Sequence, residues 1–357
     1  MASNDSGSTQ RLSRRQLNRA VLDRQCLLSR SSASVVDVLE QIGGIQAQYA
    51  PSMYIGLWSR VEGFEREHLT NALVERTVVQ GTLMRSTIHL VSRRDYWPCA
   101  LAVRAARRKW YVRAHRSGAT VEEHEHAAAI VLARLRTGPA TRSEVADLIP
   151  RHVFEGIHEF ADIVRVPPSG TWDRRRADLY GAAELWVGPE PALAPEEAVD
   201  HLVRHYLAAF GPARPKDIAD WAGLPVTTVR SSLARLPTTD YVSEDGQPLV
   251  DLDGAAIPSA DARAPVRFLP TWDATLLVHA RRAGLIEEED RPRVFHTRRP
   301  QSVATFLVDG IVAGTWVHRD GRVVIEPFRP LPLQIRRELN DEAEQIEQQL
   351  YRPPVAG

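Results

Sequence analysis

The sequence has few cysteines, few lysines and no long apolar run. Its 357 residues include two cysteines, Cys26 and Cys99, too few for a disulfide framework or a Cys-x-x-Cys zinc site. The twelve histidines show no ligand spacing around the two cysteines, so we expect neither metal nor cofactor. No apolar run reaches the roughly 18 residues of a membrane span, and residues 1–15 lack the apolar centre of a signal peptide. We therefore expect a cytoplasmic protein without membrane contact.

The charge is balanced overall but unevenly distributed. The 45 basic and 45 acidic residues give a formal net charge of zero, which argues against a protein that coats nucleic acid indiscriminately. Basic residues concentrate between Arg93 and Arg116, where Asp95 is the single acid, whereas residues 338–347 are acid-rich. The basic segment fits a helix that follows DNA phosphates as well as it fits a solvated helix.

A weak internal repeat relates residues 138–147 to residues 211–220. Both segments contain Gly-Pro-Ala and Ala-Asp at matching positions, and each follows an amphipathic helix expected at 121–135 or 196–209. The apolar spacing inside each copy suits the short second helix of a helix-turn-helix. Helical and strand-like residues follow, with strands expected at 160–166 and 184–187 after the first copy and at 240–252 after the second. This order predicts two winged-helix units.

The two ends of the chain differ in pattern. Near the start, helices are expected at 13–28 and 34–45, each capped by a serine, then around Trp58 and at 67–76, before an alternating run over 83–91 that predicts a wing strand. From Pro265 the pattern is β, with strands expected at 266–270, 275–278, 303–308, 311–317 and 323–328. Asp309-Gly310 predicts a type I′ turn. A charged helix over 333–351 should cover this small barrel or curled sheet.

The most informative motif is Gly43-Gly-Ile-Gln-Ala-Gln-Tyr-Ala-Pro-Ser52, followed by Tyr54-Ile-Gly-Leu-Trp58. It resembles the AlkZ-like branch of the AlkZ/YcaQ winged-helix DNA glycosylases. The resemblance continues through 83–91, Val166-Pro-Pro-Ser-Gly-Thr-Trp172, Leu269-Pro-Thr-Trp-Asp273 and Val308-Asp-Gly-Ile-Val-Ala-Gly-Thr-Trp316, and thus spans about residues 11–330. Each motif alone is weak, but their shared order is specific.

The resemblance implies an α+β fold. It consists of three tandem winged-helix units in a C-shaped arrangement, with a small C-terminal β-barrel-like domain. On this basis we expect units at 11–119, 120–190 and 191–258, and the β-domain with its final helix at 259–357. The arrangement implies that the chain grips duplex DNA, and we expect it to act as a monomer.

The resemblance also implies the site residues. The family's Gln-x-Gln pair corresponds to Gln46 and Gln48, which we expect to be catalytic. DNA contacts are expected from these residues: Tyr49, Ser52, Arg85, Thr87, His89, Arg298 and Arg299. Each of these residues also has a purely structural interpretation. The glutamines could be solvated or could cap backbone groups, and the polar face of the wing strand could simply be exposed to solvent. Trp172, Trp272 and Trp316 could serve as core anchors. Asp273 follows Trp272 at a strand end, where an aspartate is usually a turn or cap residue.

Chemistry explains why two neutral amides are enough for base excision. A guanine alkylated at N7 is already cationic, so its glycosidic bond breaks towards an oxocarbenium-like state without a strong acid. An amide oxygen can orient the attacking water, and amide hydrogens can hold the lesion or a phosphate. We expect Gln48 to position the water and Gln46 to assist. Because the motif carries no carboxylate, it predicts dependence on charged leaving bases.

The resulting hypothesis is a monofunctional DNA glycosylase of base excision repair. It would excise bulky N7-alkylguanine or related cationic purine adducts from double-stranded DNA, with interstrand crosslinks left open, and would protect a producer of a DNA-alkylating natural product. Two alternatives belong to other classes. A winged-helix transcriptional regulator would read bases with the helix at 226–235, and a drug-sequestering resistance protein would bind the free genotoxin.

Overall fold

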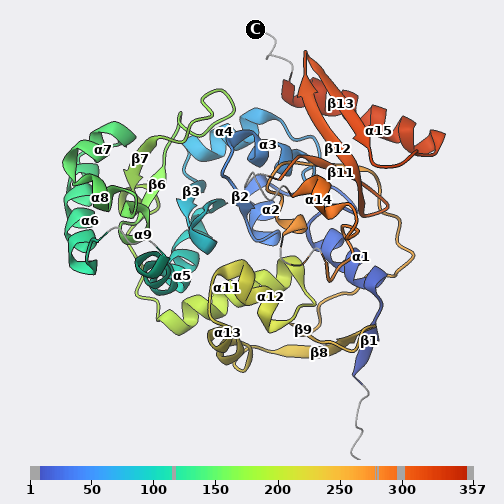
Figure 1. Ribbon diagram of the computed structural model, residues 1–357, viewed down its shortest axis with the longest axis horizontal. Helices are drawn as coiled ribbons and strands as arrows, with labels where there is room; N and C mark the ends of the chain where they lie inside the picture. Colours follow the sequence, from blue (N-terminus) through green and yellow to red (C-terminus); the bar gives the residue numbers. More distant parts are fainter. Residues whose placement is uncertain (1–8, 115–117, 278, 280, 296–301, 352–357) are drawn as a thin grey trace, which may run out of the picture.

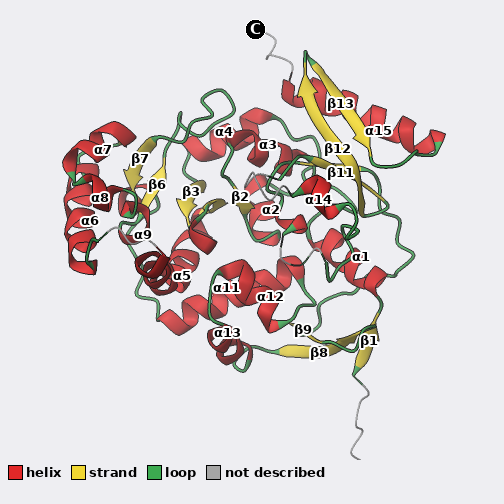
Figure 2. Ribbon diagram, in the orientation of Figure 1, coloured by secondary structure: helices red, strands yellow, loops and turns green. Residues whose placement is uncertain are grey.

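The computed structural model describes residues 9–114, 118–277, 279, 281–295 and 302–351 (Figure 1). Helices predominate, and the strands lie in three separate sheets (Figure 2). The same order of elements recurs three times along the chain: a helix, a short strand or a single bridge residue, further helices and a pair of antiparallel strands. We call these stretches the first, second and third modules.

The first module follows strand β1 (Gln10–Leu12) and helix α1 (Arg14–Arg24). It contains α2 (Val35–Gln41), β2 (Ile45–Gln46), α3 (Ala50–Trp58), α4 (Arg66–Val74), β3 (Val78–Thr82) and β4 (Ile88–Ser92). Ser13 and Ser34 cap α1 and α2 as predicted, since each hydroxyl accepts a hydrogen bond from a free backbone N–H of its first turn. Helix α5 (Arg93–Ala114) then leads to the second module.

The second and third modules contain the sequence repeat. The second comprises α6 (Val121–Leu135), β5 (Ala140–Thr141), α7 (Arg142–Leu148), α8 (Arg151–Phe154), α9 (Ile157–Phe160), β6 (Ile163–Arg165) and β7 (Leu179–Ala182). After α10 (Ala183–Trp186), the third comprises α11 (Pro195–Phe210), α12 (Pro215–Ala222), α13 (Val226–Leu233), β8 (Thr238–Ser243) and β9 (Pro248–Leu252). The matched segments place α7 and α12 at equivalent positions.

Strand pairing repeats as well. In each module the chain after the first helix pairs antiparallel with the last strand of the hairpin, as β2 with β4, β5 with β7, and Ala213 with Val250 of β9. The hairpins of the first two modules join through β3 and β6, where Gln80 lies opposite Arg165. The result is one six-stranded sheet in the order β2-β4-β3-β6-β7-β5. In the third module, β1 adds to β8 in parallel.

The C-terminal part is an open antiparallel sheet, which corrects the prediction of a barrel-like domain. Its strands are β10 (Arg267–Leu269), β11 (Thr305–Val308), β12 (Ile311–Arg319) and β13 (Arg322–Pro327), paired in that order. Among the described residues β10 and β13 are not paired with each other, so the four short strands do not close. The Asp309-Gly310 turn has the predicted geometry, with φ of 49° and 80°. Helix α14 (Arg291–Val294) precedes the hairpin, and α15 (Leu333–Ile346) follows it and ends in a π-helical turn, Glu347–Tyr351.

Three predicted strands are wrong in detail. Residues Glu184–Val187 belong to helix α10 and its C-cap, and the second hairpin strand lies earlier, at β7. Where a strand was expected over 275–278, the chain forms a 3₁₀ turn, Ala274–Leu276, capped by Asp273. The run over 83–91 is extended only from Ile88, because Met84–Ser86 is a 3₁₀ turn in which Arg85 and Ser86 have positive φ.

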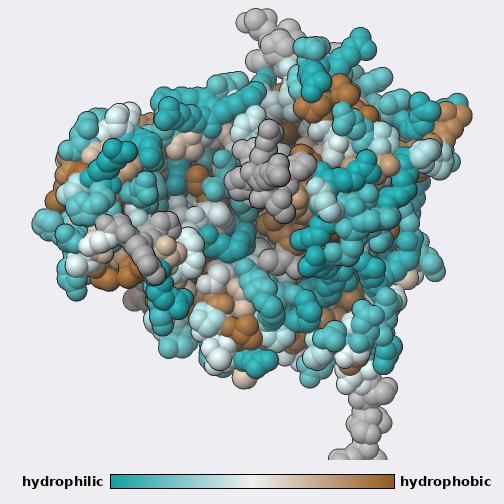
Figure 3. All heavy atoms as spheres, viewed as in Figure 1, coloured by the Kyte–Doolittle hydropathy of each residue, from teal (hydrophilic) through white to brown (hydrophobic). Residues whose placement is uncertain are grey.

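Large apolar side chains fill two main cores. One combines α5, the third module and parts of the C-terminal sheet, with Tyr206, Phe210 and Trp221 at its centre. The other packs α2–α4 against the C-terminal sheet and α15, and contains Trp58, Phe268 and Trp316. The face in Figure 3 is largely hydrophilic, with apolar side chains gathered beside β12 and β13, where Val317 and Val324 are exposed.

Candidate active site

Gln46 and Gln48 lie where the edge strand β2 of the six-stranded sheet gives way to α3. Gly43 and Gly44 turn the chain after α2 with φ of 79° and 76°, and a Cβ at Gly44 would lie 2.9 Å from the carbonyl oxygen of Leu90. Only glycine fits this approach, because β2 must come close enough to pair with β4. Gln46 then lies opposite His89 in the ladder.

The side chains of both glutamines are held by hydrogen bonds to their amide oxygens. The Oε1 atom of Gln46 accepts a hydrogen bond of 3.0 Å from Nη2 of Arg85, and that of Gln48 accepts one of 3.1 Å from the backbone N–H of Ile88. Because both partners are donors, they fix which end of each amide is oxygen. Each oxygen keeps one lone pair, and each amide nitrogen keeps its hydrogens for other partners. Gln46 is 5% exposed, whereas Gln48 is open to solvent.

Arg85 connects Gln46 to the third module. Its guanidinium also donates to the carbonyl oxygen of Trp221, and its backbone lies against Gly223, at which a Cβ would be 3.2 Å from the Arg85 nitrogen. Burial lowers the pKa of Arg85 to about 10, so the side chain still carries its charge at neutral pH. The third module thus positions the arginine that orients Gln46.

His89 and Thr87 make local hydrogen bonds. The Nδ1 atom of His89 donates to the carbonyl oxygen of Thr87 at 3.0 Å, and the Thr87 hydroxyl donates to the carbonyl oxygen of Met84 at 3.0 Å. Burial lowers the pKa of His89 to about 3, and the charge of Arg85 contributes in the same direction. The imidazole is therefore neutral at physiological pH and offers no charge to a phosphate.

The other predicted DNA contacts have different surroundings. Tyr49 is 43% exposed, and its hydroxyl accepts a hydrogen bond of 3.1 Å from Nη1 of Arg175. Ser52 is buried in α3, and its hydroxyl lies 2.8 Å from that of Thr271, next to the end of β10. Arg298 and Arg299 lie outside the described residues.

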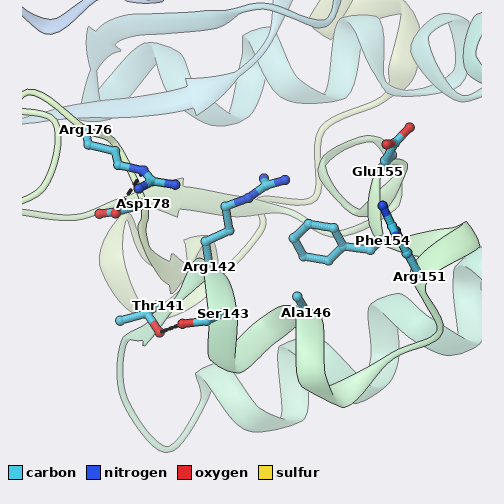
Figure 4. Close-up of a pocket in the computed structure, with 9 residues that line it drawn as sticks. All are labelled: Thr141, Arg142, Ser143, Ala146, Arg151, Phe154, Glu155, Arg176 and Asp178. Carbon is cyan, nitrogen blue, oxygen red and sulfur yellow. Dashed lines mark hydrogen bonds and ion pairs between the residues drawn. The ribbon is translucent and has the colours of Figure 1, made fainter.

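Gln48 lines a cavity of about 470 Å³ between the first and second modules. A second cavity of about 720 Å³ continues from it beside α7, and four residues line both: Arg142, Glu155, Arg176 and Asp178. We call the combined space the Gln48 cleft. Figure 4 shows the residues that line the second cavity, where the guanidinium of Arg142 lies over the ring of Phe154, at 4.6 Å from the ring centroid.

Carboxylates also line the Gln48 cleft, which the motif alone did not indicate. Glu159 is buried, pairs with Nε of Arg107 at 3.2 Å and accepts a hydrogen bond from the Ser86 hydroxyl at 3.1 Å. Glu155 is exposed, and no basic side chain of the described residues lies within ion-pair distance of it. Both belong to the second module, so a motif search around Gln48 cannot find them. In the sequence they are two acidic residues four positions apart, Glu155 at the C-cap of α8 and Glu159 within α9.

Other candidates have structural roles. Trp172 and Trp316 are core residues, as their interpretation as core anchors predicts. Asp273 caps the Ala274–Leu276 turn and forms a bidentate ion pair with Arg60, with both oxygens 3.0 Å from guanidinium nitrogens. In the basic helix α5, Arg104 pairs with Asp162 and Glu190 of neighbouring segments. These groups stabilise the fold and are not available to a substrate.

One face of α5 stays exposed. Lys109, Trp110 and Arg113 line a cavity of about 560 Å³ together with Arg85 and the 223–225 turn that precedes α13. No carboxylate of the described residues pairs with Lys109 or Arg113. The basic segment thus divides into arginines that hold the modules together and a smaller exposed face.

Comparison with known proteins identifies the class. A family model for AlkZ-like DNA glycosylases matches residues 39–348, so the chain belongs to the AlkZ-like DNA glycosylase family. It is 25% identical over 344 residues to a Streptomyces sahachiroi protein described as an interstrand DNA cross-link repair glycosylase, covering 86% of this chain and 88% of that one. Membership favours a DNA-repair enzyme acting on DNA over a transcriptional regulator or a drug-sequestering protein.

The fold agrees with this assignment. The solved structure of the DNA glycosylase AlkZ from Streptomyces sahachiroi superposes with a TM-score of 0.80 at 20% identity, covering 95% of this chain and 98% of that one. No helix in the described part of the chain combines the length and apolar character needed to cross a membrane.

Proposed function

We propose that this glycosylase hydrolyses the N-glycosidic bond of bulky, cationic N7-alkylguanine-type adducts in duplex DNA, with Gln46 and Gln48 as the catalytic pair. The observation that carries the proposal is the position of Gln48, whose oriented amide opens into a cleft large enough for a bulky substituent. The three modules serve as tandem winged-helix units in a C-shaped arrangement around the duplex, and the enzyme acts as a monomer.

The mechanism assigns separate tasks to the two amides. The Gln48 oxygen accepts from Ile88 and uses its second lone pair to orient water towards the sugar carbon as the bond to the base breaks. Gln46, fixed by Arg85, presents its amide hydrogens to the lesion or to a phosphate. The cationic base leaves as a neutral one, so no general acid is required.

Glu155 complements such a substrate. As an exposed carboxylate without an ion pair among the described residues, it can approach the positive charge of the adduct or of the oxocarbenium-like sugar. Arg142, which borders the same cleft, is suited to a phosphate. The cleft therefore contains carboxylates although the Gln-x-Gln motif has none, and these carboxylates strengthen the preference for cationic bases.

The lysines favour hydrolysis over a lyase reaction. The chain has two, Lys109 and Lys216, and neither lines the Gln48 cleft. Lys216 pairs with Asp220 at 2.8 Å. A Schiff base with the sugar therefore has no lysine nearby, and we assign the enzyme as monofunctional. Because the Streptomyces sahachiroi relative is described as an interstrand DNA cross-link repair glycosylase, the proposal extends to interstrand crosslinks. By analogy with the family, it also extends to self-protection against a DNA-alkylating natural product.

The experiment incubates the purified chain with duplexes carrying N7-methylguanine or a bulkier N7 adduct, followed by alkaline cleavage of abasic sites. The double substitution Gln46→Ala, Gln48→Ala should lower the single-turnover rate by about 100-fold or more, since loss of one positioned polar group typically has an effect of that order. Gln334→Ala on α15 is the matched control, because its amide is exposed and remote from the cleft. Full activity in the double variant would overturn the site, and absence of strand breaks with the native chain would overturn the substrate.

A further inference from the structure

Three potential metal ligands meet on the side of α11 that packs against α5. Asp95 lies in the first turn of α5, and His201 and His205 lie one turn apart on α11. The Nε2 atom of His201 is 3.0 Å from Oδ1 of Asp95, and that of His205 is 3.7 Å from Oδ2. One ligand atom from each of the three residues lies within 4.8 Å of the others.

These separations fit a small tetrahedral ion. Zinc binds imidazole nitrogen and carboxylate oxygen at about 2.0–2.2 Å, which places neighbouring ligand atoms of a tetrahedron roughly 3.3–3.5 Å apart. The two separations end on different oxygens of Asp95 and lie on either side of that value, so an ion can be accommodated by small movements of the side chains. The shorter separation is a hydrogen bond between His201 and Asp95, whereas the longer one exceeds a hydrogen bond, so a direct contact with Asp95 does not explain the position of His205.

The surroundings orient the ligands. The Ser92 hydroxyl donates to Oδ2 of Asp95 at 3.1 Å, while the Asp95 backbone N–H donates to that hydroxyl, so the carboxylate is fixed before any ion arrives. The rings of His201 and His205 are stacked with their centroids 5.6 Å apart. Such supporting hydrogen bonds are usual around metal ligands in proteins.

Burial and access suit a bound cation. The Asp95 and His205 side chains are 8% and 11% exposed, whereas His201 is 37% exposed and leaves an entry path and a position for water. Two imidazoles and one carboxylate favour zinc over magnesium or calcium, which prefer oxygen ligands alone.

Contrary to the expectation of a protein without metal, we propose that Asp95, His201 and His205 form a zinc site that links α5 to α11, with water as the fourth ligand. The site is separate from the Gln48 cleft, since none of the three residues lines it. Its role is structural: it joins the helix that follows the first module to the first helix of the third. Zinc binding to the folded chain raises its stability with concentration, because the unfolded chain does not hold the three ligands together.

The test uses the full chain after treatment with a chelator and its removal. Calorimetric titration with zinc chloride should give one site per chain, and the melting temperature should rise with zinc concentration. His201→Ala, His205→Ala should weaken binding by at least about 100-fold and abolish the rise. His126→Ala, which removes an exposed histidine of α6, is the control and should leave both unchanged.

The outcomes are decisive without any activity measurement. If the native chain binds no zinc, or if the double histidine variant binds it as tightly as the native chain, the proposal is wrong. Should the double variant prove unstable, Ser92→Ala provides a second measurement, because loss of the supporting hydroxyl should weaken zinc binding about 10-fold while both histidines stay in place. An unchanged affinity in Ser92→Ala would contradict the assigned role of Asp95.

Discussion

At the scale of single residues, Arg85 determines what Gln46 can do. A free glutamine side chain exchanges its oxygen and nitrogen ends by rotation, and a water-orienting site cannot tolerate that exchange. The half-buried guanidinium of Arg85 removes this freedom because it donates to the Gln46 oxygen and to the Trp221 carbonyl oxygen at once. We therefore consider Arg85 a positioning residue within the proposed site rather than a phosphate contact.

Replacing Arg85 separates positioning from binding. Arg85→Met should lower the single-turnover rate of base excision by about 10- to 100-fold, because Gln46 loses its orientation, while the Kd for undamaged duplex should change less than about threefold. Rates measured by alkaline cleavage and Kd measured by fluorescence anisotropy provide the two readouts. Arg85→Lys should recover part of the rate, since an ammonium can still reach one of the two acceptors. A loss of affinity equal to the loss of rate would instead make Arg85 a DNA-binding residue.

The sequence predicts the residue types of the site better than their interactions. Gln46 and Gln48 are visible as a motif because they are neighbours in the chain. Arg85 and Trp221 are brought to Gln46 by the packing of the third module, and Glu155 reaches the Gln48 cleft through the second. Such long-range contacts leave no periodic signal. The neutral state of His89 likewise depends on burial, which a single sequence does not reveal.

At the scale of elements, the repeat predicts two of the three modules. The third and second modules share Gly-Pro-Ala before a short amphipathic helix, whereas the corresponding helix of the first, α3, is buried at every residue and shows no amphipathic pattern. The short helix α10 was mistaken for a strand because four residues cannot display a helical period. Elements with caps or turn residues, such as α1 and the Asp309-Gly310 hairpin, were predicted correctly.

The exposed face of α5 should contribute to DNA affinity without sequence preference. Lys109→Ala, Arg113→Ala is expected to weaken binding to any duplex by about 10-fold and to lower the slope of log K against log salt by about 2, because each lost phosphate contact contributes roughly 0.9. Anisotropy titrations at several salt concentrations measure both quantities. Arg336→Ala, Arg337→Ala on the exposed side of α15 is the control. An unchanged salt slope in the α5 variant would show that this face does not contact DNA.

At the scale of the whole molecule, the first and third modules share cores with the C-terminal part, whereas the second module has a core of its own, to which α5 adds Tyr111. The largest core contains residues of α5, the third module and the C-terminal sheet, and the second combines the first module with α15. Because each of these two cores contains residues from several parts of the chain, those parts must fold together to form it. The predicted unit boundaries at 119, 190 and 258 stay predictions. A boundary is a position in the chain, and the shared cores do not show where one unit ends and the next begins.

Buried histidines should make the whole molecule sensitive to acid. Burial lowers the pKa values of His89 and His279 to about 3, from 6.5. Between these values the unfolded chain binds more protons than the folded one, so stability is full above about pH 6.5 and falls as the pH decreases towards 3, by about 1.4 kcal/mol per pH unit for each histidine. Urea unfolding at pH 7.5, 6.0 and 5.0 measures this slope.

Single substitutions can assign the slope to particular residues. His89→Gln should reduce the slope of stability against pH by about 1.4 kcal/mol per pH unit, which is the contribution of one histidine. His126→Gln, at an exposed position, should leave the slope unchanged. If His89→Gln keeps the native slope, the histidine is protonated in the folded chain and its proposed neutral state is incorrect.

The pairing of β3 with β6 has a consequence for substrate choice. The two walls of the Gln48 cleft belong to modules whose hairpins form one hydrogen-bonded ladder, with Gln80 opposite Arg165. The walls cannot move apart without breaking that ladder. Under the proposed function, a cleft whose width is fixed in this way selects adducts by their thickness. A wider tolerance would have to evolve through the side chains of the walls rather than through hinge motion.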